Sequence, residues 1–242
     1  MKFRLKDKYF NLNLKENNIE AVMVTGSLAC GEYDEKSNID FCIVIDDCAK
    51  EEFAESRKKI IDELNISNDS LNIYTLKSFK NLCLEGNRYL YGAKFFKKTL
   101  YKKSDFIDNV YSKFNDNLDI KKLIEEDMHL ADEVFDNYKS KYCSSEYAVS
   151  ILAQLVRNIC IDICYLIDEY DVKKYQPVKT AIESKFVSIP FSFNEYEALY
   201  NMRRNYRNDK DGYVIKGYLY GFITMWYNKY MEVAKELIKR IE

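Results

Sequence analysis

Two short apolar runs within residues 22–46, separated by a turn of small residues, constrain this chain more than any other feature. The first run ends just before Gly26 and Ser27, and the second follows a stretch that contains Asn38 and Asp40. This pattern predicts a strand, a tight turn and a second strand. Because side chains on a strand alternate with a period of two, we expect Asn38 and Asp40 on one face of the second strand. Such an arrangement suits a phosphate-holding turn that faces a metal-holding strand.

Length and charge narrow the class of protein. The chain has 242 residues, which is enough for two modest domains with buried cores. It carries 37 basic and 39 acidic residues, a formal net charge of -2, so we expect no nucleic-acid partner. No apolar run approaches the ~20 residues that cross a bilayer, and the N-terminus lacks the apolar core of a signal peptide. We therefore expect a cytoplasmic protein with no membrane partner.

The seven cysteines are scattered along the chain and include no C-x-x-C pair. Cys160 and Cys164 lie four residues apart on an expected helix, a spacing that also suits metal ligation, but no histidine accompanies them. We favour the interpretation that most of the seven are small, buried and reduced core residues.

Hydrophobic periodicity predicts the order of elements in the first part of the chain. Residues 4–17 mix apolar and charged side chains at helical spacing and are expected to form a helix before the first strand. An amphipathic helix is expected over 49–64, a third strand over 71–75, and one or two helices over 77–103. The last segment ends in four lysines, which we interpret as a solvated face rather than a phosphate site: Lys97, Lys98, Lys102 and Lys103.

Strand signals stop near Ser104, and helical periodicity dominates the rest of the chain. The expected helices cover residues 119–138, 145–170, 193–208 and 213–241. The second is almost wholly apolar on one side and is expected to be the central helix of a bundle, while Pro177 and Pro190 mark the connection that follows it. The expected fold class is α+β, with a mixed-sheet domain at residues 1–104 and an all-helical bundle at 105–242.

The turn and the second strand resemble those of the nucleotidyltransferases of the DNA polymerase β type, particularly the small bacterial and the antibiotic nucleotidyltransferases. Gly26, Ser27 and Asp40 match the family pattern, and ten residues separate Ser27 from Asn38. Asn38 stands in place of the first aspartate of the family's Asp-x-Asp strand. Asn72, on the expected third strand, stands in place of a third carboxylate. The resemblance implies a polymerase-β-like fold for the first domain.

The resemblance also implies roles for these residues. Gly26 and Ser27 would hold the triphosphate of an NTP, Asp40 and Asn38 would bind Mg²⁺ or Mn²⁺, and Asn72 would complete the catalytic set. Nucleotidyl transfer of this kind uses two metal ions held by carboxylates. The two asparagines lower the formal charge of the three positions from -3 to -1, and an amide cannot act as a base. NTP binding is therefore expected to survive, weakened, while transfer is impaired.

Two other functions stay open at this point. The chain could be an active nucleotidyltransferase that moves an NMP to a hydroxyl of a small molecule or a protein, or it could be a toxin-antitoxin or defence-type interaction protein. A homodimer also stays open. His129, the only histidine, could pair with Glu133 one turn later, but a partly buried structural role is favoured. The carboxylates that could replace the missing ones or act as a base are Glu32, Asp34, Glu35, Asp46, Asp47, Asp69, Glu125, Glu126, Glu133 and Glu146.

Overall fold

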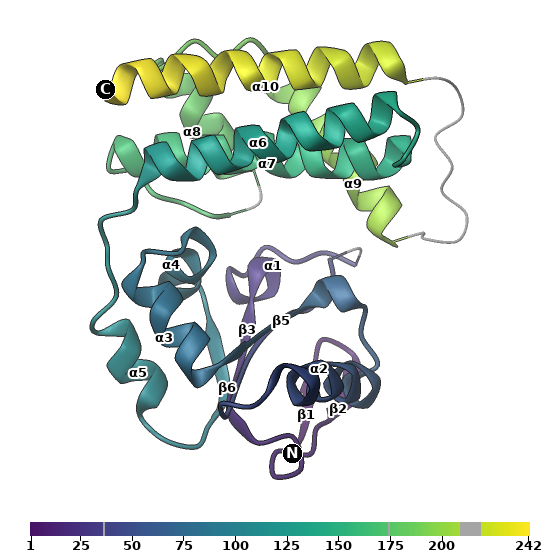
Figure 1. Ribbon diagram of the computed structural model, residues 1–242, viewed down its shortest axis with the longest axis vertical. Helices are drawn as coiled ribbons and strands as arrows, with labels where there is room; N and C mark the ends of the chain where they lie inside the picture. Colours follow the sequence, from purple (N-terminus) through teal and green to yellow (C-terminus); the bar gives the residue numbers. More distant parts are fainter. Residues whose placement is uncertain (36, 174, 209–218) are drawn as a thin grey trace. The chain divides into compact units, whose positions relative to one another are not determined.

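The computed structural model describes residues 1–35, 37–173, 175–208 and 219–242, and the chain divides into two compact units. Unit 1 is Met1–Leu118 and unit 2 is Asp119–Glu242. Among the described residues, the strands all belong to unit 1, whereas unit 2 is helical (Figure 1). The predicted α+β class is confirmed.

Unit 1 is built on a four-stranded mixed sheet with the strand order β5-β4-β3-β6. Its strands are β3 (Ile19–Thr25), β4 (Asp40–Ile45), β5 (Leu71–Thr75) and β6 (Lys98–Lys102). β3 is antiparallel to β4 and β6, whereas β4 and β5 run parallel. The register pairs Thr25 with Asp40, so the end of β3 and the start of β4 meet at one end of the sheet.

The N-terminal residues form a β-hairpin, so the prediction of a helix over 4–17 is wrong. Strand β1 (Lys2–Leu5) pairs with the antiparallel strand β2 (Lys8–Asn11). Phe3 and Phe10 are partners across the hairpin, and their rings stack with centroids 5.3 Å apart on the core of the sheet. The few apolar residues of this segment fit a helical spacing and a period of two about equally well, and packing against the sheet selects the strands.

One face of the sheet is covered by the hairpin and by α2 (Lys50–Leu64). Phe41 and Ile43 of β4 point to this face, and Ile60 of α2 is fully buried against the same core. Charged residues occupy the exposed side of α2, as the amphipathic pattern predicted. The helix predicted over 49–64 is confirmed.

Helices α3 (Leu76–Leu84) and α4 (Arg88–Phe95) lie on the other face of the sheet. Tyr74 of β5 contacts Phe79 of α3 in an edge arrangement, with ring centroids 6.0 Å apart. A 3-10 turn (Asn68–Ser70) precedes β5, and the third strand has its predicted bounds. This second face carries Asp40 as well, because the side chains of a strand alternate.

Beyond α4, the sequence prediction missed two elements. Residues 98–102 form the edge strand β6 instead of continuing a helix, and α5 (Phe106–Tyr111) follows it. Exposed lysines at both ends of β6 are typical of an edge strand, where they oppose pairing with other chains. The same lysines concealed the strand in the sequence.

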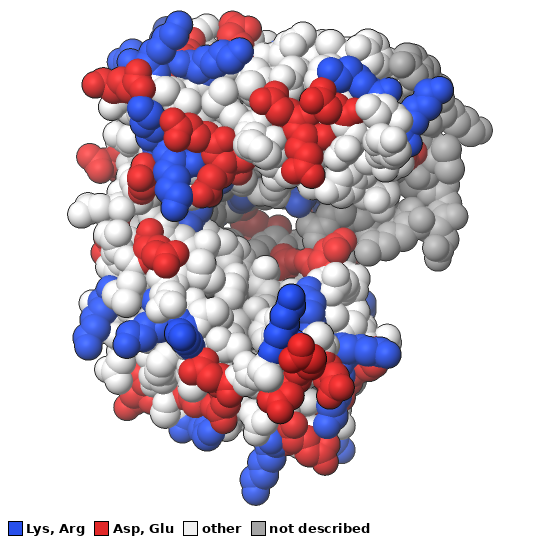
Figure 2. Space-filling view, in the orientation of Figure 1, with Lys and Arg blue, Asp and Glu red and all other residues white. Residues whose placement is uncertain are grey.

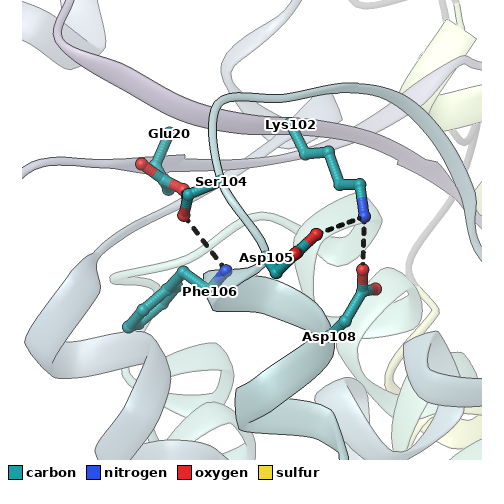
Figure 3. Close-up of polar contacts among 6 residues, drawn as sticks. All are labelled: Glu20, Lys102, Ser104, Asp105, Phe106 and Asp108. Atoms are coloured by element: carbon teal, nitrogen blue, oxygen red, sulfur yellow. Dashed lines mark hydrogen bonds and ion pairs between the residues drawn. The ribbon is translucent and has the colours of Figure 1, made fainter.

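Polar contacts fasten the start of α5 to the sheet (Figure 3). The Ser104 hydroxyl donates to the carboxylate of Glu20, a buried residue of β3. Lys102 of β6 forms ion pairs with Asp105 and Asp108 at 2.9 and 2.6 Å. These contacts explain why the boundary expected at Ser104 falls inside unit 1, which continues to Leu118.

Unit 2 is a helical bundle around α7. Its helices are α6 (Ile120–Lys139), α7 (Ser145–Leu166), α8 (Gln176–Ser184), α9 (Phe193–Asn208) and α10 (Tyr220–Ile241). α7 packs against each of the other four, as expected for a central helix. It is long and apolar enough to cross a membrane, but 67% of its most apolar window is buried inside the bundle. We therefore assign α7 as a core helix.

Unit 2 differs from the prediction at Pro177. Pro177 lies in the first turn of α8, a position that suits proline, rather than in an irregular connection. The helix predicted over 213–241 is present as α10, whereas residues 213–218 lie outside the described part of the chain. Trp226, the only tryptophan, is 1% exposed and contacts Phe191 with ring centroids 5.4 Å apart.

Candidate active site

Gly26 and Asp40 lie against each other where β3 ends and β4 begins. Gly26 opens the short helix α1 (Gly26–Ala29) with a φ of 65°, a left-handed conformation that favours glycine. A Cβ added at Gly26 would lie 3.3 Å from Cγ of Asp40 and closer still to Oδ2. Ser27 follows, half-buried. The structure thus brings the predicted turn and the predicted carboxylate together.

Asn38 lies just before β4, in irregular backbone, so it does not share a strand face with Asp40 as expected. The hairpin holds the loop that leads to both residues. Lys6, in the turn between β1 and β2, donates to the carbonyl oxygens of Asp34 and Ser37 at 3.0 and 2.7 Å. Burial lowers the pKa of Lys6, and the nearby carboxylates of Asp34 and Asp40 oppose this shift. The hairpin therefore contributes to the site by fixing its loop.

Asn72 lies in β5 and pairs in register with Cys42, two residues beyond Asp40 on the neighbouring strand. Its Nδ2 atom donates to the hydroxyl of Tyr89, a residue of α4, at 3.1 Å. The Tyr89 hydroxyl also lies 3.0 Å from Oγ1 of Thr25, and Thr25 donates to the main-chain oxygen of Asp40 at 3.4 Å. Asn72 is thus connected to Asp40 through hydrogen bonds.

No pattern in the sequence pointed to Tyr89 or Thr25 as site residues. The two residues are 64 positions apart and belong to no motif that would pair them. Burial raises the pKa of the Tyr89 hydroxyl well above its ordinary value, and burial raises the pKa of the Cys42 thiol to about 12. Both groups are therefore protonated at neutral pH, and they act in the site as hydrogen-bonding groups rather than as anions.

The carboxylates considered as substitutes are engaged elsewhere or exposed. Asp46 pairs with Lys103 at 3.3 Å, and Asp47 accepts a hydrogen bond from the main-chain nitrogen of Lys77 at 2.8 Å, both beyond the far end of β4. Within the described residues, no group of three Asp, Glu, His or Cys side chains could hold a metal ion. The remaining unit 1 candidates are exposed: Glu32, Asp34, Glu35 and Asp69.

In unit 2, His129 and Glu133 are both exposed on α6, so the histidine is not partly buried as its structural interpretation implied. Glu125 and Glu126 of the same helix are exposed too. Glu146, in the first turn of α7, is half-buried. Cys160 and Cys164 are fully buried in α7, as expected of core residues.

The basic cluster of unit 1 is largely used within that unit. Lys97 donates to the carbonyl oxygen of Lys94 at 3.1 Å, and its ammonium lies 4.2 Å from the centroid of the Tyr111 ring. Lys102 and Lys103 form the ion pairs described above. These contacts favour a structural role over a phosphate site.

A hollow of about 390 Å³ opens at the other end of β4. Ile45, the last residue of β4, lines it, whereas Asp40 is the first residue of that strand. Its rim is mainly acidic, with Glu52 and Glu55 of α2. This hollow is therefore separate from the Gly26 and Asp40 site.

Comparison with known protein families shows the family to which this chain belongs. The family profile of the nucleotidyltransferase domain matches residues 8–130, just over half of the chain. The chain belongs to the nucleotidyltransferase domain family. The match includes Gly26, Asp40, Asn72 and Tyr89. No curated protein matches the sequence.

Solved structures add a likeness in fold to this nucleotidyltransferase-family chain. A spectinomycin adenyltransferase from Enterococcus faecialis, determined with ATP and spectinomycin, has a TM-score of 0.52 and 15% identity, covering 90% of this chain and 93% of that one. A toxin-antitoxin structure with AMP-PNP covers 54% of this chain and 93% of its own, at 17% identity. Its TM-score of 0.29 is too low to support an argument. The first likeness shows the fold alone.

Proposed function

We propose that this chain binds an NTP together with its magnesium ion at Gly26, Ser27 and Asp40, and transfers nucleotidyl groups slowly or not at all. The observation that carries the proposal is the contact between Gly26 and the Asp40 carboxylate, with amides at Asn38 and Asn72. Membership of the nucleotidyltransferase family supports the nucleotide as ligand.

The residues at the three positions do not fit a pair of protein-held metal ions. Mg²⁺ prefers hard anionic oxygens, and two-metal transfer places one ion at the attacking oxygen and one at the leaving oxygen. Asp40 is the one carboxylate of the set, so the protein offers a single negative charge. An ion that arrives on the triphosphate fits better, because phosphate oxygens supply most of its ligands. Mn²⁺ suits the same oxygen ligands and would serve as well.

Activation of the attacking hydroxyl should suffer most. An amide oxygen can contact a cation, but it adds no charge and cannot take up a proton at neutral pH. One of the two amides, that of Asn72, also uses its nitrogen to bind Tyr89. We therefore expect this chain to keep binding of the metal-bound nucleotide while nucleotidyl transfer is slow or absent.

A second candidate is active transfer of an NMP to a hydroxyl of a small molecule. The likeness in fold to an adenyltransferase solved with ATP and spectinomycin supports it, since that likeness covers 90% of this chain. A carboxylate able to act as the base would then be required, because the amides of Asn38 and Asn72 cannot take up a proton. A protein acceptor is a further option with the same chemistry.

The distribution of surface charge and the state of the cysteines bear on the type of partner and on the cellular compartment. Basic and acidic side chains are interspersed on the face drawn in Figure 2, which favours a partner other than nucleic acid. All seven cysteines are free, which suits a reducing compartment such as the cytoplasm.

Calorimetric titration of the full chain with each NTP, with Mg²⁺, with Mn²⁺ and with EDTA, tests binding. We expect metal-dependent binding of at least one NTP and at least ~10-fold weaker binding in Asp40→Ala, because a charged partner contributes about 1.5–3 kcal/mol. Asp62→Ala, on the exposed side of α2, is the matched control. Failure of every NTP to bind would refute the proposal.

A gain-of-function pair tests the chemistry. In Asn38→Asp with Asn72→Asp, the two restored carboxylates should raise metal-dependent pyrophosphate release when candidate hydroxyl acceptors are supplied. Asn109→Asp with Asn117→Asp adds the same charge at exposed positions and should change nothing. Fast release by the unmodified chain, abolished by Asp40→Ala, would favour the second candidate instead.

A further inference from the structure

Residues from three strands and α4 are joined in one line of hydrogen bonds. Asn72 Nδ2 lies 3.1 Å from the Tyr89 hydroxyl, which lies 3.0 Å from Oγ1 of Thr25. Thr25 donates to the main-chain oxygen of Asp40 at 3.4 Å, a long hydrogen bond. The line starts at the amide that stands in place of a carboxylate, and it ends on the backbone of the one carboxylate that remains.

The chemistry of the groups sets the direction of this line. An amide nitrogen only donates, and a phenol carries a single hydrogen. The main-chain oxygen of Asp40 only accepts, so it takes the hydrogen of Thr25, and Tyr89 therefore accepts from Asn72 and donates to Thr25. Each hydrogen along the line thus has an acceptor.

A carboxylate at position 72 would reverse the line. An ionised carboxylate only accepts hydrogen bonds, so Tyr89 would turn its hydrogen toward it. Thr25 would then donate to Tyr89 and release the carbonyl of Asp40. Asn72 therefore does more than remove a charge, because it also sets the hydrogen bond that reaches the Asp40 backbone.

We infer that Tyr89 is a positioning residue that, through Thr25, holds Asp40 in place for the metal-bound nucleotide. The inference rests on the proposed binding of the magnesium-NTP complex at Asp40. Tyr89 acts only through Asp40, and a metal-free nucleotide gains nothing from that carboxylate. Loss of the Tyr89 hydroxyl should therefore weaken the metal-bound nucleotide selectively.

Calorimetric titration of full-length Tyr89→Phe with ATP, in Mg²⁺ and separately in EDTA, tests this. One hydrogen bond contributes about 0.5–1.5 kcal/mol, so we expect ~5-fold weaker binding of magnesium-ATP. Binding of metal-free ATP should stay unchanged. Tyr101→Phe is the matched control, because Tyr101 of β6 packs on the core at the opposite face of the sheet.

Thr25 provides a second, independent route to the same result. Thr25→Val removes the hydroxyl and keeps the shape, so it should weaken magnesium-ATP as much as Tyr89→Phe does, whereas Thr25→Ser should bind as the unmodified chain. The double variant Thr25→Val with Tyr89→Phe should show no further loss, because both changes break one line. Thermal melts followed by circular dichroism verify that each variant is folded.

Three outcomes would overturn the inference. An equal loss of binding with and without Mg²⁺ would show a structural role only, as would failure of both single variants to fold. Unchanged magnesium-ATP binding in Tyr89→Phe would show that the line does not matter. If the unmodified chain does not bind magnesium-ATP, the proposed function itself fails, and this is seen before any variant is made.

Discussion

The Asp40 carboxylate lies in the space that a side chain at residue 26 would need. The two residues come from opposite ends of a loop, and the antiparallel register of β3 and β4 brings them together. Glycine at position 26 therefore meets two requirements at once, a left-handed backbone and close approach of a carboxylate.

Gly26→Ala should abolish metal-dependent NTP binding and lower the free energy of unfolding by more than the about 1–2 kcal/mol that a left-handed backbone costs alanine. Gly31→Ala is the control, because Gly31 has a φ of 75° but no atom within 4 Å of an added Cβ. Denaturant unfolding and calorimetry compare the two variants. Equal effects of both would show that the contact with Asp40 contributes nothing.

Lys6→Met should release the loop before Asp40, since it removes the donor to Asp34 and Ser37 while keeping an unbranched side chain. We expect faster amide hydrogen exchange across the loop and weaker magnesium-NTP binding. Lys8→Met, at an exposed position of β2, is the control. Unchanged exchange in Lys6→Met would contradict the proposal that the hairpin fixes the loop.

A fragment of residues 1–118 should fold cooperatively, whereas a fragment of residues 1–104 should not. The shorter fragment lacks α5, whose buried Tyr111 contacts Phe79 with ring centroids 5.5 Å apart. Dispersion of the amide signals in nuclear magnetic resonance spectra and the shape of the thermal melt distinguish the two. A well-folded 1–104 fragment would place the domain boundary where the sequence suggested.

Glu195→Gln should destabilise the chain in a pH-dependent way. Lys229 first, and then Ser192, lower the pKa of Glu195 from 4.5 to about 2 in the folded state. The ionised carboxylate therefore stabilises the fold above pH 4.5, and this contribution is lost as the pH falls toward 2. At pH 7 we expect a loss of up to about 1 kcal/mol, chiefly from the ion pair with Lys229, because glutamine keeps the oxygen that accepts from Ser192 at the start of α9.

Urea unfolding of Glu195→Gln and of the unmodified chain at pH 7 and pH 3 measures this difference. Glu232→Gln, on the exposed side of α10, is the control and should have no effect at either pH. A deficit that stays the same at both pH values would show that the charge of Glu195 is not responsible.

Local spacing predicted the central part of unit 1 well. The turn at Gly26 and the bounds of β5 follow from short-range patterns of apolar and small residues. In contrast, the β1–β2 hairpin and β6 are short strands whose few apolar residues fit either period, and they are selected by packing on β3 and its neighbours. Sequence spacing alone could not decide these elements.

The same limit applies to the candidate site. Gly26 and Asp40 are close in sequence, and a known spacing links them, so their contact was predictable. Tyr89 meets Thr25 and Asn72 only because α4 packs on the sheet, and no local pattern encodes that contact. Asn38 shows a smaller failure of the same kind, because the strand begins two residues later than its alternation suggested.

Trp226 gives unit 2 a fluorescence signal that unit 1 lacks. It is the only tryptophan, and it is buried within unit 2 among aromatic neighbours such as Phe191. Its fluorescence will therefore report the unfolding of the helical bundle, whereas a bound nucleotide analogue would report unit 1. Superimposable denaturation curves from the two signals would mean that the units unfold as one cooperative body, and separate curves would give each unit its own stability.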